Sequence, residues 1–289
     1  MNLQQQGQLP DQGFFSVERD LITATGPEAA SYLHSQVSND IADMAVGEAR
    51  WSFVLQPQGK VDAFFRVVRS GDQVFVLDTD AGWGQALLDS VARFKLRTKV
   101  DFELASSTVI TVFGADATTT ARARLGAACV DRPWSGGVAV DIFDIPADLV
   151  GSFALEVAAD AAEALRVVHG LPTMGRDITQ DTIPNETDLI DIAVSFSKGC
   201  YRGQELVERI HARGGRRRLL RRVTSVGPMS VGDAVDCADA DGQVVAAGNL
   251  TSVASAGDSW FGLAYLTGWV EPGAEATIQG RSTTVASLF

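Results

Sequence analysis

Three strand-like segments follow one another after residue 49 with only tight turns between them, and this arrangement constrains the fold more than any other feature. Alternation of polar and apolar residues predicts strands over 50–56, 61–69 and 73–79. The links are Pro57-Gln58-Gly59-Lys60 and Ser70-Gly71-Asp72. Links this short join antiparallel neighbours, because a parallel pair needs a crossover of about a dozen residues or more. We therefore expect an antiparallel meander.

The rest of the chain repeats this mixture of helix and strand and then changes texture. Helical spacing predicts helices over 26–36, 84–95, 115–125 and 161–168, and strands are expected over 100–104, 109–113, 137–143 and 153–157. Residues 173–197 lack periodicity and are expected to form a long connecting segment. Short strand-like runs follow the next helix, at 216–226, 234–237, 243–252, 260–266 and 276–285. They predict a small antiparallel barrel.

These elements predict an α+β protein with three parts. We expect an N-terminal α+β subdomain over 12–105, a second α+β subdomain over 106–205, and a C-terminal helix and β-barrel over 206–289. A length of 289 residues is ample for such an arrangement.

Composition bounds the surroundings and partners of the chain. A formal net charge of −12 argues against a nucleic-acid partner, because phosphates are repelled at long range. No apolar run reaches the roughly 18 residues that a membrane span needs. The three cysteines are odd in number and far apart, which favours neither a disulfide framework nor a metal motif and suggests a reduced, cytoplasmic setting. The Gln-rich segment 1–11 lacks an apolar signal core and reads as a frayed tail.

The segment Lys198-Gly199-Cys200-Tyr201-Arg202-Gly203-Gln204-Glu205 carries the strongest chemical signal. Its cysteine lies between two glycines, two residues from a cation on either side, where a helix is expected to begin. Helix N–H groups and positive charges favour a thiolate, so Cys200 is a candidate nucleophile or ligand. The plainer interpretation is a small buried hydrophobe. The glycines favour the chemical one, since they allow a tight turn and a close approach to a ligand.

This octapeptide resembles the signature of the YgfZ family, folate-binding proteins related to the aminomethyltransferase of the glycine cleavage system. Further matching stretches precede and follow it in the same order. They are 26–40, Pro57-Gln58-Gly59-Lys60, Gly170-Leu171-Pro172, Gly175-Arg176-Asp177, Pro184-Asn185-Glu186, 209–214 and 247–252. The resemblance covers nearly the whole chain.

The resemblance implies a fold and a role. The two α+β subdomains and the barrel would surround a central channel that holds tetrahydrofolate or a related reduced folate. The protein would support iron–sulfur cluster assembly or repair, with Cys200 essential. Its partners would be reduced folate and the iron–sulfur assembly or client proteins, and no resident metal site is expected.

Candidate folate-binding residues come from three places. Lys198 and Tyr201 belong to the octapeptide, and Asn39 with Asp40 follows the first helix, where the pair could equally be a plain cap and turn. Arg218 belongs to a cluster of arginines: Arg209, Arg213, Arg216, Arg217, Arg218, Arg221 and Arg222. This cluster is either a solvated face or an anion site, for a folate's glutamate tail, for an acidic protein or for RNA. Aromatic residues of the first hairpin are core or a channel wall: Trp51, Phe53, Phe64 and Phe65.

The alternative function is a tetrahydrofolate-dependent aminomethyl or methyl transferase. It needs a carboxylate at the reactive nitrogen of the folate, and Asp62 is the nearest candidate. The transferases carry an acidic pair at this place and a Tyr-Thr-Gly-Glu loop, whereas this chain has one acid and no such loop between 136 and 156. Whether the protein is an enzyme stays open at this stage.

Overall fold

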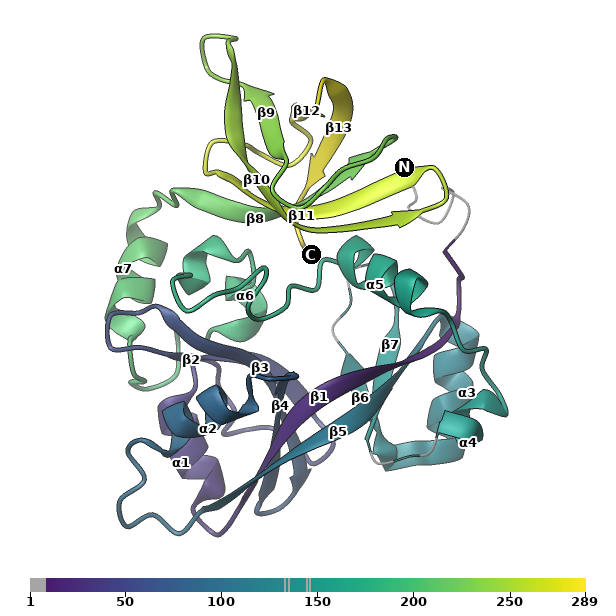
Figure 1. The fold of residues 1–289 in the computed structure, drawn as a ribbon. Coiled ribbons are helices and arrows are strands. Elements are labelled where there is room, and N and C mark those ends of the chain that lie inside the picture. Colours follow the sequence, from purple (N-terminus) through teal and green to yellow (C-terminus); the bar gives the residue numbers. More distant parts are fainter. Residues whose placement is uncertain (1–8, 133, 135, 144, 146) are drawn as a thin grey trace.

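The computed structural model describes residues 9–132, 134, 136–143, 145 and 147–289, apart from the side chains of residues 127 and 147. Most of the N-terminal segment expected to be a frayed tail therefore lies outside the described residues. One antiparallel sheet of seven strands forms the base, and a closed barrel of six strands stands on the opposite side of a layer of helices (Figure 1). The expected α+β class is confirmed.

The elements follow one another along the chain with short links. The strands of the large sheet are β1 (Gly13–Thr25), β2 (Ala49–Leu55), β3 (Val61–Gly71), β4 (Val74–Asp80), β5 (Asp101–Phe113), β6 (Cys129–Arg132) and β7 (Ala139–Ile142). The helices are α1 (Ala29–Gln36), α2 (Gly84–Ala92), α3 (Ala115–Leu125), α4 (Ala147–Gly151), α5 (Ala159–Val168), α6 (Ile190–Ala193) and α7 (Gln204–Arg213). The barrel strands are β8 (Arg218–Ser225), β9 (Ala234–Ala238), β10 (Val244–Ala256), β11 (Ser259–Thr267), β12 (Glu275–Ile278) and β13 (Arg281–Ala286).

Two long central strands make the two halves of the base a single sheet. The strand order is β2-β3-β4-β1-β5-β7-β6, and β1 pairs with β5 from Gly13 opposite Phe113 to Thr25 opposite Asp101. The sequence predicts two strands where β5 runs unbroken, because the polar stretch 105–108 looks like a loop. Pairing with β1 keeps that stretch extended, so the expected boundary at residue 105 falls within a strand.

Alternation along β3 divides the core of the base into two layers. Ala63, Phe65 and Val67 pack with α1 and α2 on one face of the sheet. Phe64 points to the other face, toward α5, α7 and the barrel. The period-two pattern of this strand thus gives one face to the helices and the other to the interior beneath the barrel.

The C-terminal part is a closed barrel in the order β10-β11-β8-β13-β12-β9. The sequence predicts one strand over 276–285, but the structure has the hairpin β12–β13. Gln279 and Gly280 form its turn with φ of 51° and 74°, the left-handed values that a two-residue hairpin turn requires. Among the described residues, no helix combines the length and the apolar character that a membrane crossing needs.

Candidate functional site

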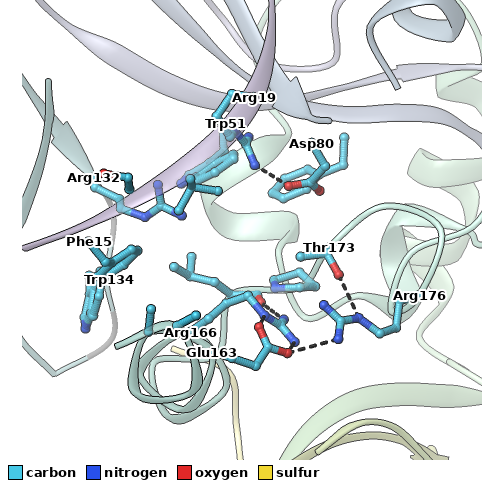
Figure 2. Close-up of a pocket in the computed structure, with 17 residues that line it drawn as sticks. Phe15, Arg19, Trp51, Asp80, Arg132, Trp134, Glu163, Arg166, Thr173 and Arg176 are labelled. Carbon is cyan, nitrogen blue, oxygen red and sulfur yellow. Dashed lines mark hydrogen bonds and ion pairs between the residues drawn. The ribbon is translucent and has the colours of Figure 1, made fainter. Parts of the chain in front are cut away.

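A pocket of about 270 Å³ lies between the large sheet, α5 and the segment after α5 (Figure 2). Its lining comes from β1, β2, β3, α5 and the stretches around residues 132 and 173. The lining residues are Phe15, Ser16, Val17, Arg19, Trp51, Phe64, Asp80, Arg132, Trp134, Ala159, Ala162, Glu163, Arg166, Leu171, Pro172, Thr173 and Arg176. The volume is close to the lower end of the usual range for small-molecule sites.

Aromatic rings form one part of the wall. Trp51 and Phe64, on neighbouring strands, stack with centroids 4.7 Å apart and planes inclined by 16°. Phe15 lies 6.3 Å from the ring of Trp134, and Figure 2 shows these two rings opposite Arg176 and Thr173. Flat apolar walls of this kind suit a planar ring system.

Arginine side chains form the polar part of the lining, and carboxylates behind them hold them in place. Arg19 is almost fully buried and donates to Asp78 at 2.7 Å and to Asp80. Burial alone would lower the pKa of Arg19, but the charges of Asp78 and Asp80 outweigh it and raise the pKa. This guanidinium therefore stays charged beside the pocket.

The network continues under the sheet surface through Arg66, whose side chain has no exposed area. Arg66 donates to Asp78 at 2.7 Å and to Asp141 at 2.8 Å. Asp141 also accepts from Arg132 at 2.8 Å. Burial favours the neutral form of Asp141, yet Arg132 and Arg66 outweigh it and lower the pKa of this carboxyl. Arg132 thus reaches the pocket with a fixed orientation.

A second group of charges joins the pocket to the barrel. Arg166 donates to Glu163 at 2.8 Å and to Ser252 of β10 at 2.9 Å. Arg176 donates to Glu163 at 3.0 Å, a contact drawn in Figure 2. Burial would raise the pKa of Glu163, but the two arginines outweigh it and lower the pKa. Arg132 and Arg176 each keep guanidinium donors that no described residue uses, and a bound anion could accept from them.

None of the residues that the sequence singles out for the site lines this pocket. Cys200, Lys198 and Tyr201 lie in the loop before α7, near the end of α1 and the turn between β2 and β3. Asn39 and Asp40 lie beside Lys198, and Arg218 begins the barrel. The structure thus brings together the residues expected around Cys200, but it separates them from the pocket.

Lys198 acts as a cap on the end of α1. Its ammonium group donates to the carbonyls of His34, Val37 and Asn39, the last two at 2.7 and 3.0 Å. Burial lowers the pKa of Lys198 to about 8, against the opposing charge of Asp40. All three ammonium donors are engaged by backbone, so the expected action of Lys198 on the Cys200 thiol has no contact to support it.

Arg202 is also engaged elsewhere. It donates to Asp62 at 3.0 Å, to Ser90 and to the carbonyl of Leu55. Asp62 in turn accepts from Ser90 at 2.7 Å. These contacts hold the carboxylate on which the transferase alternative depends, and they lie outside the lining of the pocket. The geometry therefore gives that alternative no support.

The glycines on either side of Cys200 differ in their surroundings. Gly203 has φ of 79°, and a Cβ there would lie 2.4 Å from the carbonyl oxygen of Gln56. Gly199 has open space around it. The close approach at Gly203 is therefore to the β2–β3 turn and not to a ligand.

Cys200 itself is exposed, whereas Cys129 and Cys237 are buried. The interpretation of Cys200 as a packed hydrophobe is therefore wrong. Burial raises the pKa of Cys129 and of Cys237, with nearby acidic charge adding to the effect at both. Cys200 is the one thiol of the three that a reagent or a partner can reach directly. Among the described residues, no group of three His, Cys, Asp or Glu side chains converges to hold a metal ion.

The remaining candidates have structural partners. Asn39 donates to the carbonyls of Trp51 and Ile192, and its oxygen accepts from the N–H of Asp40. Tyr201 is buried, which raises the pKa of its phenol. Arg218 donates to Glu186 at 3.1 Å and lies over the ring of Tyr265. These contacts fit caps and packing better than ligand binding.

Several pocket residues stand in motifs that the sequence analysis quotes without assigning a role. Leu171 and Pro172 belong to Gly170-Leu171-Pro172, and Arg176 to Gly175-Arg176-Asp177. Their place beside one another in the chain was the available signal. Arg19 and Arg166 gave no such signal, since their roles depend on partners far away in the sequence.

Comparison with known proteins gives the relationships of the chain. It is 28% identical over 221 residues to a tRNA-modifying protein YgfZ of Vibrio atlanticus, covering 70% of this chain and 66% of that protein. It is 29% identical over 221 residues to a mitochondrial iron–sulfur cluster assembly factor IBA57 homolog of Pyricularia oryzae, covering 72% of this chain and 56% of the other. No family model matches.

The fold agrees with these relationships. The structure of the glycine cleavage system aminomethyltransferase T from Bartonella henselae superposes with a TM-score of 0.78 over 96% of this chain and 86% of that one, at 21% identity. The chain belongs to the YgfZ family. Its YgfZ signature is the exposed loop around Cys200, and its aminomethyltransferase-like fold supplies the pocket. The two features lie apart in the molecule.

Proposed function

We propose that this protein binds a reduced folate in the pocket and supports the assembly or repair of iron–sulfur clusters through Cys200. The pairing of an aromatic wall with arginine donors carries the folate part of the proposal. A folate joins a flat pterin and an aminobenzoyl ring to a glutamate tail. The rings suit the wall of Trp51 and Phe64, and the carboxylates suit Arg132 and Arg176.

The size of the pocket fits this assignment with one condition. A volume of about 270 Å³ takes the ring system of a folate and leaves the tail at the opening. Arg19 and Arg166 have their donors engaged by protein groups, so they set the electrostatic field, while Arg132 and Arg176 have donors to offer.

The role in cluster chemistry is supported by the relatives. One is named as a tRNA-modifying protein and another as an iron–sulfur cluster assembly factor. Both descriptions agree if the client of this protein is a cluster-containing enzyme that modifies tRNA. Because one exposed thiol supplies one ligand, the remaining ligands of any cluster in transit would come from the partner protein. The odd, unpaired cysteines fit the reducing cytoplasm in which we place this activity.

The folate assignment is tested by calorimetry with 5-formyltetrahydrofolate. Arg176→Gln removes a charge-assisted contact and is expected to weaken binding by about 10- to 100-fold. Arg218→Gln is the matched control, because Arg218 lies outside the pocket lining, and its affinity is expected to stay unchanged. A loss in Arg218→Gln without a loss in Arg176→Gln would move the folate site to the arginine cluster.

The cysteine assignment is tested by complementation of a cluster-dependent enzyme activity. Cys200→Ser is expected to abolish support while leaving folate affinity intact, because the thiol lies away from the pocket. Cys237→Ser, at a buried position, controls for general loss of a thiol. Full support by Cys200→Ser would rule out a role for the thiol.

A further inference from the structure

Two groups of exposed cations lie on either side of the loop that carries Cys200. The segment before β5 supplies one group, and the end of α7 with the link to β8 supplies the other. Together with the apolar side chains between them they form what we call the Cys200 surface: Arg93, Phe94, Leu96, Arg97, Lys99, Phe196, Cys200, Arg209, Arg213, Arg216 and Arg217. Within the described part of the chain, none of its seven cationic side chains has an ion-pair partner.

Direct contacts join the parts of this surface. The Arg202 guanidinium lies 5.6 Å from the centroid of the Phe94 ring, which ties the loop before β5 to the Cys200 loop. Phe196 stacks on His211 of α7, with centroids 3.9 Å apart and planes inclined by 19°. Figure 1 shows α1, α2 and α7 along the same side of the molecule. Cys200 therefore lies between the two cationic groups.

The charge of this surface contrasts with that of the molecule. The chain has a net charge of −12, yet seven unpaired cations gather here, with Glu205 and Glu208 as the acids of α7. Like charges crowded together repel one another and give little stability to an isolated chain. They would attract an acidic partner and direct its approach.

Apolar side chains are exposed among these cations. Leu96 is 91% exposed, Phe94 52% and Phe196 38%. Apolar anchors inside a charged rim are the composition of a protein–protein contact. A single-stranded nucleic acid would use aromatic faces for stacking. Here Arg202 lies over Phe94, His211 covers a face of Phe196, and the most exposed side chain, Leu96, is aliphatic.

We propose that the Cys200 surface docks an acidic protein segment that carries apolar side chains, with Cys200 inside the contact. The cations bring the partner to the surface, and Phe94, Leu96 and Phe196 bind its apolar groups. This inference depends on the surface alone. It holds whether or not the pocket takes folate and whether or not the thiol is used chemically.

Binding of a synthetic probe tests the proposal by fluorescence anisotropy. The probe is a labelled peptide of aspartate and glutamate with interspersed leucine and phenylalanine. We expect saturable binding that weakens with added salt. Arg97→Glu is expected to weaken it roughly three- to tenfold, and Leu96→Ser about tenfold. Cys200→Ser is expected to bind as the parent does, which separates docking from the proposed function.

Matched controls lie on other parts of the molecule. Val244→Ser removes an apolar side chain that is 72% exposed on the barrel, and Arg124→Glu reverses an exposed charge on α3. Both are expected to leave binding unchanged. A second peptide with serine in place of leucine and phenylalanine is expected to bind more weakly than the first.

Other outcomes overturn the proposal. They are no saturable binding, equal binding of the serine peptide, or equal losses in the control variants. Oligouridylate that binds as tightly as the peptide would make this an RNA surface. A dimer in analytical ultracentrifugation that Leu96→Ser dissociates would show that a second copy of the chain covers it.

Discussion

The cations of the signature loop show how a residue pattern can predict a charge and miss its partner. The sequence places Lys198 and Arg202 two residues from Cys200, and the structure turns both away from it. Lys198 binds the end of α1, and Arg202 binds Asp62. Neither partner is near in sequence, so spacing alone could not reveal them. Exposure of Cys200, by contrast, leaves its proposed role open to test.

Lys198→Met should expose the structural role of the buried ammonium group. At about pH 7 we expect a loss of about 1–3 kcal/mol in the free energy of unfolding, because three carbonyls lose their donor. The folded-state pKa of Lys198, about 8, lies below the unfolded value of 10.5. The unfolded chain therefore binds more protons between these values, and the wild type should gain stability over the variant as the pH rises through that window.

Urea denaturation of both proteins at about pH 7 and about pH 10 measures this difference. A stability difference that is the same at both pH values would mean that the buried ammonium group does not titrate in this range.

The buried network under the pocket makes a second residue-scale prediction. Arg66→Met leaves Asp78 and Asp141 buried with one cation fewer, and we expect a loss of about 3–5 kcal/mol. Arg50→Met is the control, because Arg50 forms its ion pairs with the more exposed Asp43 and Glu48, and its loss should stay within about 1 kcal/mol. Urea denaturation compares the two, and equal losses would contradict the network's role.

At the scale of elements, the turn between β2 and β3 packs against the start of α7. Gly59 and Gly203 face each other there, both with φ of 79°. The turn that the sequence predicts as a simple hairpin link is therefore also the seat of the signature helix. This second role depends on a contact across more than a hundred residues, which short-range patterns do not encode.

Gly203→Ala should be costly and Gly199→Ala nearly neutral. The first substitution places a methyl group 2.4 Å from the Gln56 carbonyl oxygen in a left-handed backbone. Steric overlap and backbone strain together predict a loss of about 2–4 kcal/mol. The second meets open space. Thermal unfolding of the pair measures the contrast, and similar melting temperatures would show that the loop relaxes at no cost.

Much of the fold followed from periodicity, and the errors have a common cause. Helices α1, α3 and α5 and strands β2 to β4 lie close to the expected ranges, because one face of each is apolar. The long β5 and the β12–β13 hairpin were missed. In each case pairing with a neighbouring strand decides the outcome: it carries β5 through a polar stretch and turns one apparent strand into two. The pocket was missed for the same reason, since its arginines meet carboxylates from other elements.

At the scale of the whole molecule, acid should weaken the link between pocket and barrel. The folded-state pKa of Glu163 is below its ordinary value of 4.5. Its contribution to stability is therefore present above about pH 4.5 and is lost as the pH falls through the lower folded-state value. We expect the wild type to lose stability over this range more steeply than Glu163→Gln. Urea titrations at a series of acidic pH values test this, and parallel curves would contradict it.

The shared strands β1 and β5 have a consequence for how the molecule can move. A bend between the two halves of the base would have to break backbone hydrogen bonds along thirteen paired positions. The floor on which a guest molecule rests is therefore stiff, and its admission depends on side chains and on the helical side of the opening. For the same reason the halves are not separable pieces: severing the chain within β5 would deprive each half of part of the other's scaffold.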